Sequence, residues 1–201
     1  MTQALIVVDM QNGFCHPQGS LPAMGRGLPD IERAVRGCME AVASAREADL
    51  PVVFTRHLYR PGYADAGPNF DLVGADLRAV GGLLAGSWDG DVIDELEVTG
   101  ADLIVDKCRY DAFLNTSLDR LLRGMGVTRV TVCGVVTNVC VESTVRAAFM
   151  RDYGVELIAD ACAAATRPLH EAALEVISHY RFAEVVSLAD GYRPGRVEAA
   201  A

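Results

Sequence analysis

The sequence predicts an α/β fold in which a parallel sheet carries helices on both faces. Short apolar runs, typical of buried strands, alternate with longer amphipathic stretches along the chain. Strand–helix alternation of this kind produces right-handed βαβ units. The chain has 201 residues, of which 51% are hydrophobic and 22% charged, and no Pro/Ser/Gly-rich linker divides it. A single globular domain over residues 1–201 is therefore expected.

The first half of the chain is expected to contain two strands and one long helix. Residues 4–8 form a continuous apolar run, the pattern of a strand buried on both faces. Residues 12–27 are rich in Gly and Pro and are expected to form a loop. Apolar residues at helical spacing predict a helix over 29–48, and the run at 51–55 predicts the second strand. Residues 56–90 are also rich in Gly and Pro, and an irregular loop of this length usually covers an active site.

The second half of the chain repeats the alternation. Gly124 and Gly154 end two of its expected helices. A tight turn is expected at 134–138, and residues 190–201 are expected to form a frayed tail. The other expected elements are strands at 103–105, 130–133, 155–159 and 183–187 and helices at 116–124, 139–152 and 168–180.

Reactive side chains follow three of the expected strands. Asp9 ends the first strand, Lys107 ends the third, and the turn after the fourth delivers Cys140 into the first turn of a helix. Parallel sheets bind ligands at the carboxyl ends of their strands, so an acid, a base and a thiol could converge there. A helix N-terminus and an ammonium group would both lower the pKa of the thiol. Asp9 could carry the thiol proton to a leaving amine.

Each of these residues, taken alone, also has an ordinary structural interpretation. Asp9 could cap the loop after its strand, Lys107 could be solvated, and Cys140 could be a packing residue. Their occurrence at equivalent strand ends favours the chemical interpretation.

Composition excludes several classes of function. Twenty-seven acidic and 18 basic residues give a net charge of −9, which weighs against a nucleic-acid partner. No apolar run approaches the ~20 residues that span a bilayer, and the start of the chain lacks the basic region of a signal peptide, so a cytoplasmic location is expected. The six cysteines are irregularly spaced and form no CxxC, so neither a zinc site nor a disulfide framework is indicated.

Three sequence blocks resemble the isochorismatase-like cysteine hydrolase superfamily, which includes nicotinamidase, N-carbamoylsarcosine amidase, biuret hydrolase and ureidoacrylate amidohydrolase. The blocks lie at 7–12 (VVDMQN), 107–113 (KCRYDAF) and 134–144 (GVVTNVCVEST), in the order typical of that family. The resemblance covers residues 4–188, which we take as the core of the domain.

The resemblance implies a doubly wound, Rossmann-like sheet of six strands and a catalytic triad of Asp9, Lys107 and Cys140. It also implies a cis peptide bond between Val135 and Val136, and an oxyanion hole formed by the backbone N–H groups of Val136 and Cys140. The implied reaction is hydrolysis of a C–N bond through a thioester on Cys140, without a cofactor. Family members commonly form dimers or tetramers, so a homodimer or homotetramer is expected.

Branch-specific residues narrow the expected substrate. Metal-using nicotinamidases carry an Asp-x-His pair where this chain has His57 and Tyr59, so no metal is expected and nicotinamide is a weaker substrate candidate. Nicotinamidases also tend to have Asp at the position that Asn138 occupies here. True isochorismatases typically lack the cysteine, so Cys140 weighs against that branch. The stretch 86–96 looks most like the ureidoacrylate and biuret hydrolases, which favours a small carboxamide, ureido or carbamoyl substrate.

Residues near the expected strand ends are candidate substrate contacts. They are Phe14, His57, Tyr59, Trp88, Arg109, Tyr110 and Phe113. Arg109 could bind a carboxylate or form a surface salt bridge, and Trp88 could be packing in the loop that covers the site.

Four alternatives to the amidohydrolase remain open at this point. They are a nicotinamidase-type or isochorismatase-type hydrolase, a binding protein that keeps the fold without activity, a peroxide sensor that uses Cys140, and a flavodoxin-like nucleotide binder. The last is disfavoured because no glycine-rich phosphate loop is present.

Overall fold

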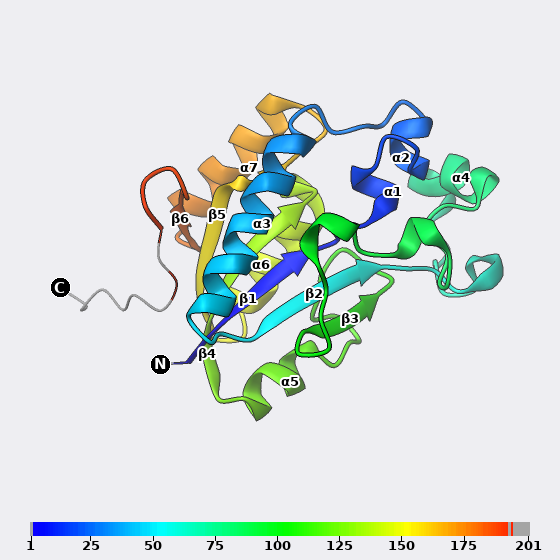
Figure 1. The fold of residues 1–201 in the computed structure, drawn as a ribbon. Coiled ribbons are helices and arrows are strands. Elements are labelled where there is room, and N and C mark those ends of the chain that lie inside the picture. Colours follow the sequence, from blue (N-terminus) through cyan, green and yellow to red (C-terminus); the bar gives the residue numbers. More distant parts are fainter. Residues whose placement is uncertain (1, 193, 195–201) are drawn as a thin grey trace.

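The sheet at the centre of the molecule has six parallel strands in the order β3-β2-β1-β4-β5-β6 (Figure 1). This arrangement comes from a computed structural model, which describes residues 2–192 and 194; residues 193 and 195–201 of the expected tail lie outside the described part. The strands are β1 (Thr2–Val8), β2 (Val52–His57), β3 (Leu103–Lys107), β4 (Val127–Val135), β5 (Gly154–Ala163) and β6 (Glu184–Val186). Strands β1, β2 and β3 follow one another from the middle of the sheet to one edge. The chain then returns to the middle, where β4 pairs with β1, and β5 and β6 extend to the other edge. The predicted fold class is confirmed, and the β1/β4 boundary is the switch point at which such sheets bind ligands.

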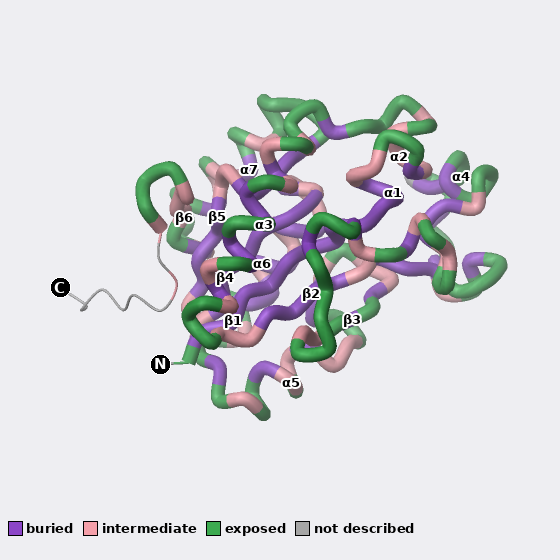
Figure 2. The backbone as a smooth tube through the Cα atoms, viewed as in Figure 1, coloured by how far each residue is buried: buried purple, intermediate pink, exposed green. Residues whose placement is uncertain are grey.

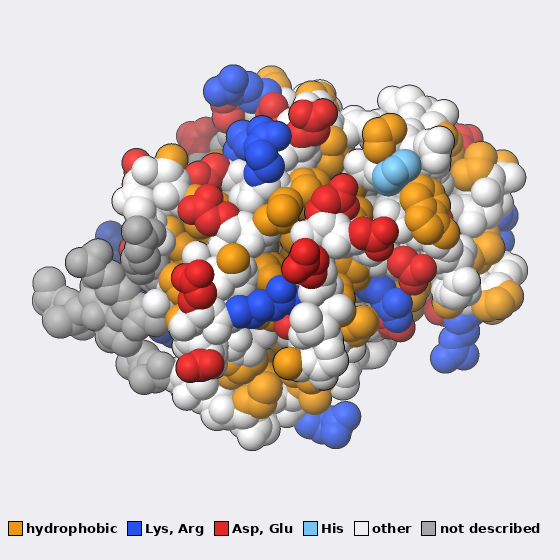
Figure 3. Space-filling model, in the orientation of Figure 1, with side chains coloured by type: hydrophobic (Ala, Val, Ile, Leu, Met, Phe, Trp, Pro, Cys, Tyr) orange, Lys and Arg blue, Asp and Glu red, His pale blue; other side chains and the backbone are white. Residues whose placement is uncertain are grey.

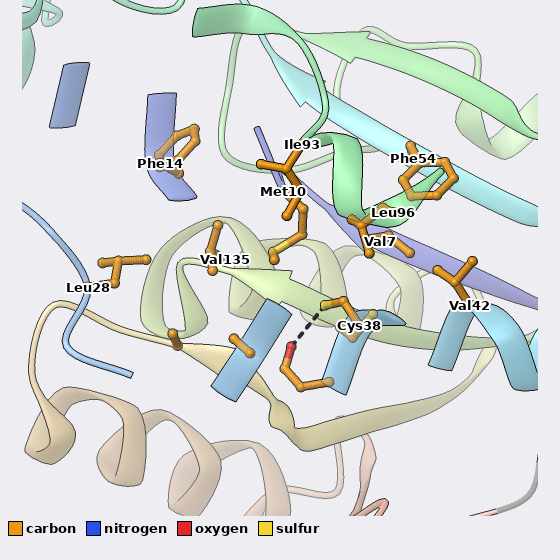
Figure 4. Packing of buried hydrophobic residues seen from close by; sticks show 14 of the residues in the cluster. Val7, Met10, Phe14, Leu28, Cys38, Val42, Phe54, Ile93, Leu96 and Val135 are labelled. Atoms are coloured by element: carbon orange, nitrogen blue, oxygen red, sulfur yellow. Dashed lines mark hydrogen bonds between the residues drawn. The ribbon is translucent and has the colours of Figure 1, made fainter. Parts of the chain in front are cut away.

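Two apolar clusters lie on opposite faces of the sheet, because alternate residues of a strand point to opposite sides. Val7 belongs to the cluster under α3 (Ile31–Glu47), part of which is drawn in Figure 4. Its neighbour Ile6 belongs to the cluster that contains buried residues of α5 (Leu118–Gly124), α6 (Glu142–Phe149) and α7 (Arg167–His179). Figure 2 shows the resulting buried backbone through the centre of the sheet. Helices therefore cover both faces, as predicted.

The two segments expected to be irregular contain helices. They hold α1 (Asn12–Cys15), α2 (Ser20–Ala23), α4 (Asp71–Val80) and the 3-10 turns η1 (Pro61–Tyr63) and η2 (Trp88–Gly90); η3 (Asp94–Leu96) follows. Phe70, the N-cap residue of α4, and Leu77 within the helix are buried one heptad apart, so the helix presents an apolar face inward. Gly81 follows α4 with a φ of 68°, so it caps this helix rather than marking a loop. The prediction that residues 56–90 form an irregular loop is therefore wrong for α4, because their glycines were interpreted only as residues that interrupt helices.

A close approach between β1 and β4 shapes the carboxyl edge of the sheet. Gly134 pairs with Val8 and has a φ of 114°, and a Cβ at this position would collide with the backbone of Val8. Only glycine fits this position. The approach places Asp9 beside the segment that follows β4.

The face of the molecule shown in Figure 3 carries side chains of several kinds. Across the described residues on the face shown in Figure 3, acidic, basic and apolar side chains are interspersed, and no continuous basic stripe is seen. Among the described helices, none combines the length and the apolar character needed to cross a bilayer.

Candidate active site

A buried ion pair joins the ends of β1 and β3. Lys107 Nζ donates to Asp9 Oδ2 at 2.6 Å, and neither side chain is exposed to solvent. Thr55, on β2 between them, donates from Oγ1 to Asp9 Oδ1 at 2.7 Å. Lys107 Nζ also donates to the backbone carbonyl of Arg109 at 3.1 Å. Both charges are thus held in fixed positions, and the interpretation of Lys107 as a solvated residue is wrong.

Cys140 lies in a π-helical turn, η4 (Thr137–Val141), that precedes α6. The sequence prediction placed it in the first turn of a helix; that turn is π-helical, and α6 itself starts at Glu142. The peptide bond between Val135 and Val136, just before η4, is cis. The thiol Sγ lies 3.9 Å from His57 Nδ1, and the ligand atoms of Asp9, His57 and Cys140 all lie within 4.8 Å of one another. Together with the 2.6 Å contact between Lys107 and Asp9, these distances show that Asp9, Lys107 and Cys140 converge as expected.

Burial has the largest effect on the pKa of the Cys140 thiol. Removal from water raises its pKa above the ordinary value; Lys107 acts in the opposite direction without reversing the shift, and Asp9 adds to it. The structure therefore gives the opposite direction to the lowered pKa expected from the sequence. Burial, the largest single effect, lowers the pKa of Lys107, but the charges and hydrogen bonds of Asp9 and Cys140 together outweigh it, so the net shift is upward. At neutral pH the thiol holds its proton, so attack requires a base at the moment of reaction.

His57, at the end of β2, is a buried neutral imidazole in contact with these groups. Its Nε2 lies 2.8 Å from the Tyr59 hydroxyl, and its Nδ1 lies 3.5 Å from Lys107 Nζ. Burial, and then the positive charge of Lys107, lower its pKa to about 3. Because an ammonium can only donate, we assign Nδ1 as the acceptor and Nε2–H as the donor to Tyr59. The ring therefore adds no charge to the site at neutral pH.

The neutral state of His57 predicts acid sensitivity of the fold. Between pH 6.5, the ordinary pKa, and about 3, the unfolded chain binds a proton at His57 that the folded chain does not, so stability falls as pH drops. The expected loss is about 1.4 kcal/mol per pH unit. We expect His57→Gln to flatten this slope in urea unfolding, whereas His179→Gln, at an exposed position, should follow the wild type. An equal slope in His57→Gln would contradict the assignment.

The cluster of Asp9, His57 and Cys140 also has the spacing of a potential metal site. The ammonium of Lys107, however, already uses the Asp9 carboxylate at 2.6 Å and faces His57 Nδ1 at 3.5 Å. A second cation would meet this positive charge at close range and would have to displace the thiol proton. These residues therefore fit an ion poorly.

A cavity of about 190 Å³ opens above the Cys140 thiol. Four of the expected substrate contacts line it, namely Phe14, His57, Tyr59 and Tyr110. Val136 and Cys140, the two expected oxyanion donors, lie in the same wall.

The other three expected contacts do not line this cavity. Trp88 is 50% exposed and packs edge-on against the His16 ring. Arg109 donates to the backbone carbonyls of Asp65 and Cys108 at 2.9 and 2.6 Å, so it ties loops together. Phe113 is buried in the cluster on the α5 and α6 face. The places of these residues in the sequence, near the expected strand ends, were not enough to predict which side chains line the cavity.

The sequence prediction also missed part of the site. Thr55 was named only as a strand residue, although its parallel register opposite Val8 places it beside Asp9. The cavity wall contains additional apolar residues from α2, α4 and the residues next to these helices, namely Leu21, Met24, Phe70, Leu77 and Leu83. The spacing of Phe70 and Leu77 was the signal that could have identified α4.

Comparisons with known proteins agree with this geometry. The Isochorismatase domain family matches residues 3–190. A ureidoacrylate amidohydrolase, RutB, of Methylobacterium radiotolerans is 39% identical over 191 residues, covering 89% of this chain and 74% of the relative. The crystal structure of a cysteine hydrolase from Pseudomonas syringae pv. phaseolicola superposes with a TM-score of 0.83 at 35% identity, covering 94% of this chain and 89% of that one. N-carbamoylsarcosine amidase from Thermoplasma acidophilum gives a TM-score of 0.78 at 28% identity, covering 99% and 100%.

Proposed function

This chain belongs to the isochorismatase family and is an amidohydrolase, an enzyme that hydrolyses C–N bonds of small molecules. We propose that it cleaves ureido substrates with Cys140 as the nucleophile. The observation that carries this proposal is the position of the Cys140 thiol, which lines the cavity and lies beside the buried Asp9–Lys107 pair. A binding protein would not need a buried ion pair beside a thiol, because such a pair is costly to bury.

The first half of the proposed reaction forms a covalent intermediate. Asp9 accepts the proton of the Cys140 thiol as Sγ attacks the substrate carbonyl carbon. Backbone N–H groups of Val136 and Cys140 bind the oxyanion, and such a donor contributes ~2.7–4 kcal/mol to transition-state stabilisation. Asp9 then protonates the leaving nitrogen, the C–N bond breaks, and an S-carbamoyl group (or, from a carboxamide, an acyl thioester) stays on Cys140.

The second half regenerates the enzyme. Asp9 accepts a proton from a water molecule that attacks the thioester carbonyl, and the proton returns to Sγ as the C–S bond breaks. Lys107 remains charged throughout and holds the Asp9 carboxylate in position through its 2.6 Å contact. His57 contributes a neutral acceptor next to the thiol.

A substrate panel tests this function. Purified protein is incubated with biuret, N-carbamoyl amino acids, N-alkylureas, nicotinamide and simple carboxamides, and ammonia is measured with and without a chelator. We expect release from at least one ureido compound at a rate that the chelator leaves unchanged. Release from nicotinamide alone, or loss of activity with the chelator, would contradict the ureido assignment.

We also propose that the chain assembles into a homodimer or homotetramer. Phe149 and Met150, at the end of α6, and Tyr180, after α7, are large apolar side chains that are 44%, 72% and 64% exposed. Such side chains favour burial against another surface. Sedimentation velocity tests the assembly, and a monomer at micromolar concentration would contradict it.

A further inference from the structure

The cavity above Cys140 has a continuous apolar wall. Phe14 comes from α1, Met24 follows α2, Leu77 comes from α4, and Leu83 lies in the segment after it. Leu77 and Leu83 are themselves buried, so the wall is packed against the rest of the molecule. These segments lie far apart in the sequence and converge over the thiol.

The charges around this cavity cancel. Asp9 and Lys107 form a buried ion pair, and His57 is neutral. Asp9 and Lys107 lie behind the lining, and the charged residue in the lining itself is Arg26, whose guanidinium donates to Asp76 of α4 at 2.7 Å. These two side chains are 46% and 69% exposed, so this charge is matched at the solvent-facing rim. Among the described lining residues, no unmatched positive charge faces the interior.

The size of the cavity limits what it can hold. An apolar protein cavity of about 150 Å³ accommodates benzene, and the cavity here measures about 190 Å³. A carboxylate transferred into this wall would lose its water without gaining an ionic partner, which is strongly unfavourable. An alkyl or aryl group gains from the same transfer.

We infer that this site selects ureido or amide substrates whose non-reacting part is uncharged and apolar, with a bulk up to about one aromatic ring, and discriminates against carboxylate-bearing analogues. This inference rests on the proposed function, because it concerns the group attached to the carbonyl that Cys140 attacks.

A matched substrate pair tests the selectivity. Butylurea and 3-ureidopropionate share the ureido group and have similar lengths, but only the second carries a carboxylate. Hydrolysis of butylurea consumes water and yields butylamine, ammonia and carbon dioxide, whichever C–N bond breaks first. We expect kcat/KM to favour butylurea at least ~tenfold, equivalent to ~1.4 kcal/mol. A preference for 3-ureidopropionate that disappears in Arg26→Gln would overturn the inference, because Arg26 would then act as the carboxylate receptor.

Alkylation of Cys140 separates this inference from the proposed function. Iodoacetamide and iodoacetate each form a thioether at Sγ with loss of iodide, but they differ in charge. Mass spectrometry measures the two rates at Cys140, and the same ratio at glutathione corrects for intrinsic reactivity. We expect the corrected ratio to favour iodoacetamide at least ~tenfold. If no ureido compound of the panel or of this pair is hydrolysed, the proposed function fails, while this ratio still decides the charge selectivity.

Substitution at Met24 provides a matched control. Lysine and glutamine both resemble methionine in length, but only lysine adds a charge to the wall. We expect Met24→Lys to shift both ratios toward the anionic compound by about tenfold, and Met24→Gln to keep the wild-type order. Equal shifts in the two variants would show that the shape of the wall, rather than its lack of charge, determines the selectivity, and would contradict the inference.

Discussion

Replacement of Cys140 by alanine should reduce hydrolysis of the best ureido substrate by at least ~10⁴-fold, the scale seen when a catalytic nucleophile is removed. Without the thiol no covalent intermediate can form, and the remaining backbone N–H groups can only bind the substrate. Cys140→Ser should be similarly inactive, because a hydroxyl is a weaker nucleophile than a thiol and its proton is harder to remove. Steady-state kcat/KM on the substrate identified by the panel measures both effects.

A second buried cysteine provides the control for these variants. Cys133 lies on β4 and is fully buried like Cys140, but it does not line the cavity. Cys133→Ala should therefore lower the free energy of unfolding through lost packing while kcat/KM stays within about threefold of the wild type. If Cys140→Ala retained more than a small fraction of the wild-type rate while staying folded, the nucleophile would have to lie elsewhere.

The sequence was sufficient to predict the strand ends of the site. Asp9 and Lys107 follow strands that must be parallel in a βαβ chain, and parallel strands place their carboxyl ends at one edge. Sheet topology therefore determines which backbone positions converge there. The apolar periodicity of β1 and α3 is strong, because both are packed along most of their length.

Sheet topology did not predict which side chains line the cavity, nor the pKa of the buried Cys140 thiol. Trp88, Arg109 and Phe113 follow or cover the same edge, yet none of the three lines the cavity. The pKa of Cys140 depends on how completely the thiol is removed from water, and this is decided by the packing of distant segments. Neither property can be obtained from spacing along the chain.

Breaking the Asp9–Lys107 pair should cost both stability and activity. Lys107→Met leaves the Asp9 carboxylate buried without its ammonium partner, and removal of one member of a buried pair costs about 3–5 kcal/mol in the free energy of unfolding. Asp9→Asn leaves the ammonium unpaired and should have an effect of similar size. Urea unfolding measures both. Arg167→Met breaks the exposed Arg167–Glu171 pair, whose side chains are 81% and 62% exposed, and should cost less than ~1 kcal/mol.

The double variant Asp9→Asn/Lys107→Met separates the structural role of the pair from its chemical role. It removes both charges together, so no charged group is left unpaired, and its free energy of unfolding should exceed that of either single variant. Activity should nevertheless be lost in all three. An amide in place of the Asp9 carboxylate cannot accept the thiol proton that the buried Cys140 retains at neutral pH, and without Lys107 the carboxylate is no longer held in position. A double variant as unstable as the sum of the two single losses would mean that the charges do not act as a pair. A Lys107→Met variant with wild-type kcat/KM would show that the ammonium only balances charge and does not position the base.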